Sequence, residues 1–155
     1  MKRILLALLL SVFSINISLA QHGHSGKAHH MSSMGKIVFE TKKADVEIKA
    51  YLNDIETAMK AMAKDKNIKI DMSKVDPNLT HHLSFMIKSG VNTGKIKDAK
   101  TEVRLNDKVK EYKLFLMDEH YGSDISLKEK GTYYVTLILD TEKKGIITFN
   151  FNIKP

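Results

Sequence analysis

The feature that most constrains the fold is a series of short stretches, from residue 80 onward, in which apolar residues occupy every second position. Leu83, Phe85 and Ile87 alternate with His82, Ser84 and Met86, and a similar period of two recurs over 133–139. Strands are expected at residues 37–39, 46–52, 80–88, 101–105, 109–117, 124–127, 133–139 and 147–153. Short alternating strands separated by frequent turns predict an all-β protein, an antiparallel β-sandwich of seven to eight strands.

One helix is expected between the second and third strands. Residues 54–64 carry apolar side chains at helical spacing, and Asn53 stands where an N-cap is expected. Met59 and Met62 lie on the apolar side of this helix, so the spacing predicts that both pack in the core. Residues 65–79 have the composition of a loop.

The first twenty residues have the pattern of a cleavable signal peptide. Lys2 and Arg3 precede the apolar stretch 4–15, and small residues lead to a cleavage point after Ala20. The apolar stretch is shorter than the roughly 20 residues that cross a bilayer as a helix. We therefore expect a periplasmic or secreted protein without a permanent membrane anchor.

The remaining chain divides into two parts. Residues 21–35 are rich in His, Met, Gly and Ser and predict a flexible tail, whereas 36–155 have the length and hydrophobic pattern of a single domain. Once Lys2 and Arg3 are removed from the 25 basic residues, 23 stand against 18 acidic ones. The lysines are interspersed with acidic residues, so a nucleic-acid partner is not expected.

Several classes of chemistry are not expected from the composition and motifs. The chain has no Cys, which excludes disulfides, thiolate metal sites and cysteine nucleophiles. It also lacks the sequence signatures of serine hydrolases, zinc peptidases, P-loop proteins and dinucleotide-binding enzymes. We therefore predict that the protein is not an enzyme.

Histidine and methionine are concentrated in a few places. The candidate metal ligands are His22, His24, His29, His30, Met31 and Met34 in the tail, His81, His82 and Met86 on one strand, and Met117 and His120 around one turn. Imidazole binds Cu(II) or Zn(II), and thioether sulfur favours Cu(I). This pattern favours copper over zinc.

Strand geometry limits which of these residues can share an ion. His82 and Met86 project from the same face, but four strand residues separate their Cα atoms by about 13 Å. A third segment must contribute ligands. A simple up-and-down strand order brings Met117 and His120 near Met86, whereas a crossed connection or strong twist brings His120 to His82. His81 projects from the opposite face, with the core residues.

Four segments together resemble a known family: T-H-H-L-S-F-M-I at 80–87, the spacing of Gly94, Asp98, Ala99 and Val103, M-x-x-H-Y-G at 117–122, and K-G-T-Y-Y-V at 130–135. They are similar to the small exported immunoglobulin-like domains of the YtkA-like and FixH-like kind, which are associated with bacterial copper and heavy-metal handling. The resemblance covers residues 80–155. It implies an immunoglobulin-like β-sandwich and an association with metal handling.

The sequence thus favours a periplasmic protein that binds, buffers or passes copper through His and Met ligands. Its partners would be the metal ion and a periplasmic or membrane metal-transport or assembly protein. Two alternatives stay open at this point. One is an adhesion or complex-assembly module without metal, and the other is non-covalent haem binding through a His and Met pair.

Overall fold

The computed structural model describes residues 34–155, and the predicted signal peptide and most of the predicted tail lie outside this range. The described strands are β1 (Lys36–Lys43), β2 (Val46–Asp54), β3 (His81–Ser89), β4 (Ile96–Leu105), β5 (Lys108–Lys113), β6 (Phe115–Met117), β7 (His120–Ile125), β8 (Tyr133–Thr141) and β9 (Gly145–Ile153). The helix α2 (Ile55–Lys66) and a short 3₁₀ helix, η1 (Met72–Lys74), lie between β2 and β3. Within this part of the chain, no helix is long and apolar enough to span a membrane.

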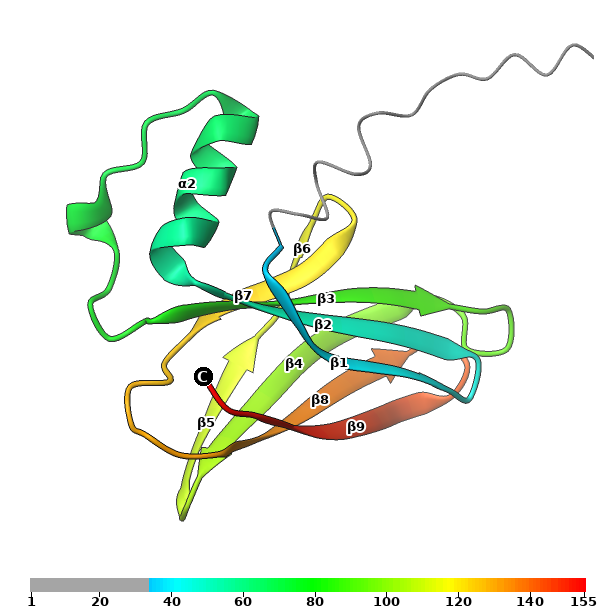
Figure 1. The fold of residues 1–155 in the computed structure, drawn as a ribbon. Coiled ribbons are helices and arrows are strands. Elements are labelled where there is room, and N and C mark those ends of the chain that lie inside the picture. Colours follow the sequence, from blue (N-terminus) through cyan, green and yellow to red (C-terminus); the bar gives the residue numbers. More distant parts are fainter. Residues whose placement is uncertain (1–33) are drawn as a thin grey trace, which may run out of the picture.

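The strands form two antiparallel sheets packed face to face (Figure 1). One sheet has the order β1-β2-β3-β7-β6 and the other β5-β4-β8-β9. The predicted β-sandwich with one helix is confirmed. The described residues contain nine strands because the stretch expected as one strand, 109–117, is divided at Leu114.

Leu114 is the point where the chain passes from one sheet to the other. Its side chain is buried at 3% exposure, and its backbone N–H donates to the carbonyl of Ala99 on β4 at 3.0 Å. Before it, β5 pairs with β4; after it, β6 pairs with β7 in the opposite sheet. A buried leucine thus fixes the crossover between the two layers.

The core lies between the sheets and is built from the alternating residues that the sequence indicates. Leu83 and Phe85 of β3 are fully buried, as are Leu137 and Leu139 of β8. The Phe85 ring meets the ring of Phe151 edge to face, with centroids 6.2 Å apart. Because period-two alternation places every second side chain on one face, β4 and β8 bury one face in the core. In β3, consecutive residues from His82 to Phe85 are buried, so that strand is covered on both faces.

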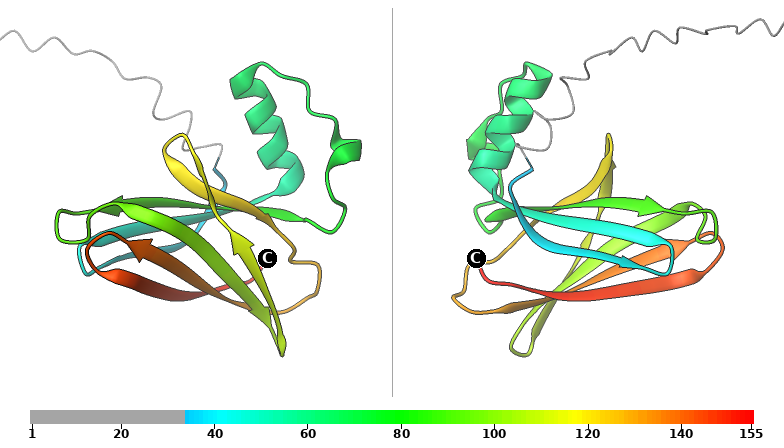
Figure 2. Two further views of the ribbon diagram at one scale, coloured as in Figure 1. Left: turned by 180° about the vertical axis from the view of Figure 1, so that it is seen from behind. Right: turned by 45° about the vertical axis from the view of Figure 1, so that its right-hand side comes forward.

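The helix α2 does not contribute to this core. None of residues 55–66 is buried, so the prediction that Met59 and Met62 pack in the core is wrong. The N-cap is Asp54 rather than Asn53: its carboxylate accepts a hydrogen bond from the N–H of Thr57 at 2.8 Å. Figure 2 shows α2 and the β6–β7 hairpin projecting from the same side of the sandwich, away from the β5-β4-β8-β9 sheet.

Replacing Phe85 with Ala tests the core assignment. Phe85 is 0% exposed, so the change leaves a cavity between the sheets and should lower the free energy of unfolding by about 3–5 kcal/mol in a urea titration. Val91→Ala is the matched control, because Val91 is 82% exposed and should change stability by less than about 0.5 kcal/mol. Equal effects from both changes would contradict the assignment.

Candidate metal centre

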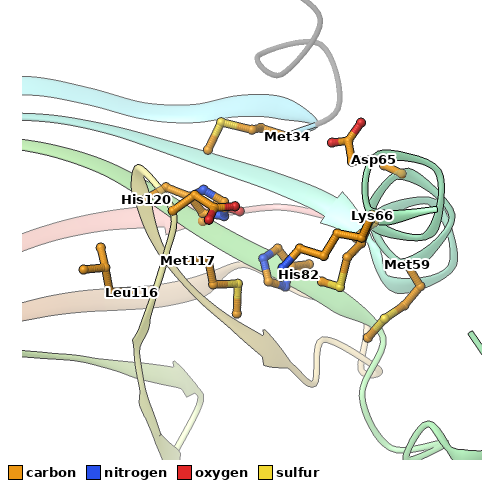
Figure 3. A pocket seen from close by; sticks show the side chains of 13 residues that line it. Met34, Met59, Asp65, Lys66, His82, Leu116, Met117 and His120 are labelled. Atoms are coloured by element: carbon orange, nitrogen blue, oxygen red, sulfur yellow. The ribbon is translucent and has the colours of Figure 1, made fainter. Parts of the chain in front are cut away.

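A cavity of about 420 Å³ lies on the outer face of the β3–β7 pair, between that face, the β6–β7 hairpin and α2. Figure 3 shows the side chains that surround it, with Met59 and Lys66 reaching in from α2. Its histidine and methionine lining residues are Met34, Met59, Met62, His82, Met117 and His120. Two imidazoles and four thioethers therefore border one space.

His82 is held in place by burial and by a carboxylate. It lies opposite Asp124 in the β3–β7 register, and its Nδ1 is 2.7 Å from the Asp124 carboxylate. The His82 side chain is only 11% exposed. Because an ionised carboxylate only accepts hydrogen bonds, Nδ1 carries a proton, and in the neutral ring it is Nε2 that offers a lone pair. This arrangement, in which a carboxylate orients a histidine, is the one that accompanies metal-ligating histidines.

Gly122 provides the space that the His82 ring occupies. Gly122 faces Ser84 in the register, two pairs along from His82 and Asp124. A Cβ atom on Gly122 would come within 2.8 Å of His82 Nε2 and 3.1 Å of Cε1. Tyr121 and Gly122 both lie within β7, and the glycine is needed for close approach of the imidazole.

The β6–β7 hairpin brings two more candidates to the cavity. Met117 and His120 are register partners on either side of its turn, and both are half-buried. The rings of His120 and His82 are 6.5 Å apart between centroids and nearly perpendicular. The crossed connection, rather than the up-and-down order, is the one observed, because β7 pairs directly with β3.

The separation of the two rings is close to what a shared ion requires. An imidazole nitrogen lies about 2 Å from a bound metal, and the ring centre about 1 Å beyond it, so two imidazoles on one ion have centroids up to about 6 Å apart. The observed 6.5 Å lies just beyond this limit, so the two rings would have to move closer together to share an ion.

Met34 reaches the cavity from the start of the described chain and is 7% exposed. The next residue, Gly35, has a φ of +98°, and a Cβ atom there would overlap the carbonyl oxygen of Leu52. This glycine lets the chain press against the end of β2, beside the start of α2. Met34, which the sequence places in the tail, is thereby buried at the edge of this cavity.

Met59 and Met62 are candidate ligands that the sequence reasoning missed. Their helical spacing correctly indicates that they lie on one side of α2, but that side faces the cavity rather than the core. The sequence did carry a signal, which is the type of residue on that side of the helix. The inner side of this helix carries Ala and Met in place of the bulky branched side chains typical of a core-packing helix.

Two predicted candidates lie outside the cavity. His81 projects from the other face of β3, with Nδ1 2.9 Å from the hydroxyl of Thr80. Burial lowers its pKa, an effect that the nearby Asp54 carboxylate partly offsets. Met86 accepts a hydrogen bond from the Tyr51 hydroxyl at 3.8 Å and does not line the cavity. The tail candidates His22, His24, His29, His30 and Met31 lie outside the described residues.

The cavity lining combines imidazole and thioether groups with charged side chains, of which Lys66 extends from α2 toward His82 (Figure 3). Asp65, Lys66 and Asp118 line it and are exposed. Over residues 34–155, no group of three or more His, Asp or Glu side chains is arranged to hold a metal ion. Any metal bound here would thus rely on thioether sulfur together with the two imidazoles.

Replacing Gly122 with Ala tests the packing of the His82 ring without any metal. The added methyl group should displace the imidazole from Asp124, shift the His82 ring resonances in an NMR spectrum, and lower stability by about 1–3 kcal/mol. Ser123→Ala, at the neighbouring position of β7, is the control and should leave those resonances in place. Unchanged His82 resonances in the Gly122→Ala variant would refute this packing.

No family model matches the sequence, and a search of curated proteins finds no match. The resemblance to YtkA-like and FixH-like domains therefore stays a prediction. Among solved structures, the chain is similar to a copper-bound variant of FetP from uropathogenic Escherichia coli, with 17% sequence identity and a TM-score of 0.49. The match covers 78% of this chain and 94% of that one. This similarity is too distant to assign residue roles in this chain.

Proposed function

We propose that this is an exported protein that binds copper, as Cu(I), in the cavity between α2 and the β6–β7 hairpin. The observation that carries the proposal is the meeting of His82 and His120 with the sulfur atoms of Met117, Met34 and the two helix methionines. These residues come from four separate segments of the chain. Their gathering in one cavity is not explained by the needs of the core, which lies on the other side of the sheet.

The donor atoms favour copper over the other common metals. Thioether sulfur is a soft ligand that suits Cu(I), and imidazole suits both copper states. Zinc sites are usually built from thiolate, imidazole and carboxylate, and calcium or magnesium sites from oxygen. With no Cys in the chain, methionine is the soft ligand that an exported protein retains in an oxidising compartment.

Each candidate ligand has a proposed task. His82 binds through Nε2 while Asp124 holds its Nδ1, and His120 approaches from the hairpin. Met117 supplies sulfur from the same hairpin, and Met34, Met59 and Met62 supply it from the opposite side. The His and Met residues of the tail, before Met34, are proposed to capture copper and deliver it to the cavity.

The cavity also suits release to another protein. Exposed residues of its lining, Leu116, Lys66 and Asp118, connect it with the surface, so a bound ion is within reach of a partner. We therefore assign the protein a role in holding copper or passing it to a periplasmic or membrane transport or assembly protein.

A Cu(I) titration against a competing chromophoric chelator tests the site. Removing one ligand with His120→Ala or Met117→Leu should weaken binding by about tenfold or more, equivalent to about 1.4 kcal/mol. Met86→Leu is the matched control, because Met86 lies on the same strand as His82 but outside the cavity and should leave the affinity unchanged. Unaltered affinity in both ligand variants would overturn the proposed site.

Replacing Asp124 with Asn tests the orientation of His82. The amide can no longer impose the same tautomer on His82, so Cu(I) affinity should fall by about 10–100-fold although Asp124 does not touch the ion. Ser123→Ala again serves as the control. If the Asp124→Asn variant binds copper as tightly as the unaltered protein, His82 does not act as a ligand held by this carboxylate.

The same purified proteins distinguish copper binding from the two alternatives, haem binding and an adhesion or assembly module. A Soret band on adding haem, lost in the His120→Ala variant, would favour haem binding over copper. A protein that binds neither copper nor haem but purifies with a stable partner would favour the adhesion or assembly module.

A further inference from the structure

Residues 55–80, which we call the 55–80 excursion, leave and rejoin the sheet at a single point. Asp54 at the end of β2 is the register partner of His81 at the start of β3. The N–H of Ile55 donates to the carbonyl of Thr80 at 3.0 Å, which ties the two ends of the excursion together. α2 is therefore attached to the sandwich at one end, beside His82.

α2 is stabilised mainly by interactions within itself. Hydrogen bonds from Thr57 to Asp54 cap its first turn and hold the pKa of that carboxyl below its usual value. Glu56 and Lys60 form an ion pair one turn apart. At the other end, the N–H of Asn67, in the left-handed conformation, donates to carbonyls of the last turn. Such a helix holds its shape without depending on a tightly packed face.

The side of α2 that faces the sheet is only half-buried. No residue of 55–66 is buried, and Ala58, Met59, Ala61 and Met62 face the sheet across the cavity rather than filling it. Methionine side chains are flexible and adapt to changes in spacing. The helix is thus a preformed element separated from the sandwich by the candidate copper site.

We infer that α2 is a lid that closes over the cavity when copper binds, and that Met59 and Met62 are the residues through which the metal draws it in. This inference rests on the proposed function. His82, His120 and Met117 lie on the sandwich and its hairpin, whereas Met59 and Met62 lie on the lid, so an ion held by both groups joins them. Release of copper frees the lid and opens the cavity to a partner.

The coupling between copper binding and lid closure has a size that can be measured. A ligand shifts the balance between the open and closed lid only by the ratio of its affinities for the two states. If opening removes the two thioethers, that ratio equals the affinity lost when both are replaced. The factor by which copper slows lid opening should therefore equal the factor by which copper affinity falls in the double Met59→Leu, Met62→Leu variant.

Amide hydrogen exchange of the full mature chain, with and without buffered Cu(I), tests the lid. Copper at about 100 times its dissociation constant should slow exchange of peptides from 55–66 by about tenfold or more, up to about 100-fold. Peptides from β8, 133–141, report on the core and should not change. In the double variant, copper should still bind through the remaining ligands but should no longer slow exchange in 55–66.

Met72→Leu is the matched control, because Met72 lies in the same excursion but does not line the cavity. It should behave as the unaltered protein does. If copper binds but exchange in 55–66 is unchanged, or is slowed equally in the double variant, the lid is refuted and the copper site stands. If no copper binds, the proposed function and the lid fail together.

Discussion

The buried crossover at Leu114 is the constraint on which the arrangement of this molecule depends. By ending β5 in one sheet and starting β6 in the other, it places the β6–β7 hairpin beside β3 instead of beside β4. The pairing of β3 with β7 then sets Asp124 and Gly122 against the His82 side chain. A core leucine, which never touches the candidate site, thus determines which residues meet there.

The site combines a rigid half with an adaptable half. His82 is fixed by its contact with the Asp124 carboxylate, by burial and by the close fit of its ring against Gly122. The short hairpin holds Met117 and His120 near it. The opposite wall is a self-capped helix with no buried residue. A rigid half can set the preference for the metal, whereas an adaptable half lets a buried ion enter and leave. This division of roles suits a protein that transfers copper.

The fold was largely predictable because period-two alternation is local, and it marked both the core faces and the sandwich. The site was predictable only in part. His82, His120 and Met117 have side chains of the types that bind copper, but Asp124 is 42 residues from its partner and nothing near His82 in sequence points to it. The spacing of Met59 and Met62 showed that they share one side of the helix. It did not show that this side faces a cavity rather than the core.

X-ray absorption spectroscopy of the Cu(I)-loaded mature protein tests the central claim most directly, because it reports the atoms bound to the metal. A mixed shell of imidazole nitrogen and thioether sulfur is predicted, with the nitrogen contribution reduced in His82→Ala and the sulfur contribution reduced in Met117→Leu. A shell of nitrogen and oxygen alone, or a spectrum that neither change alters, would contradict a copper site in this cavity.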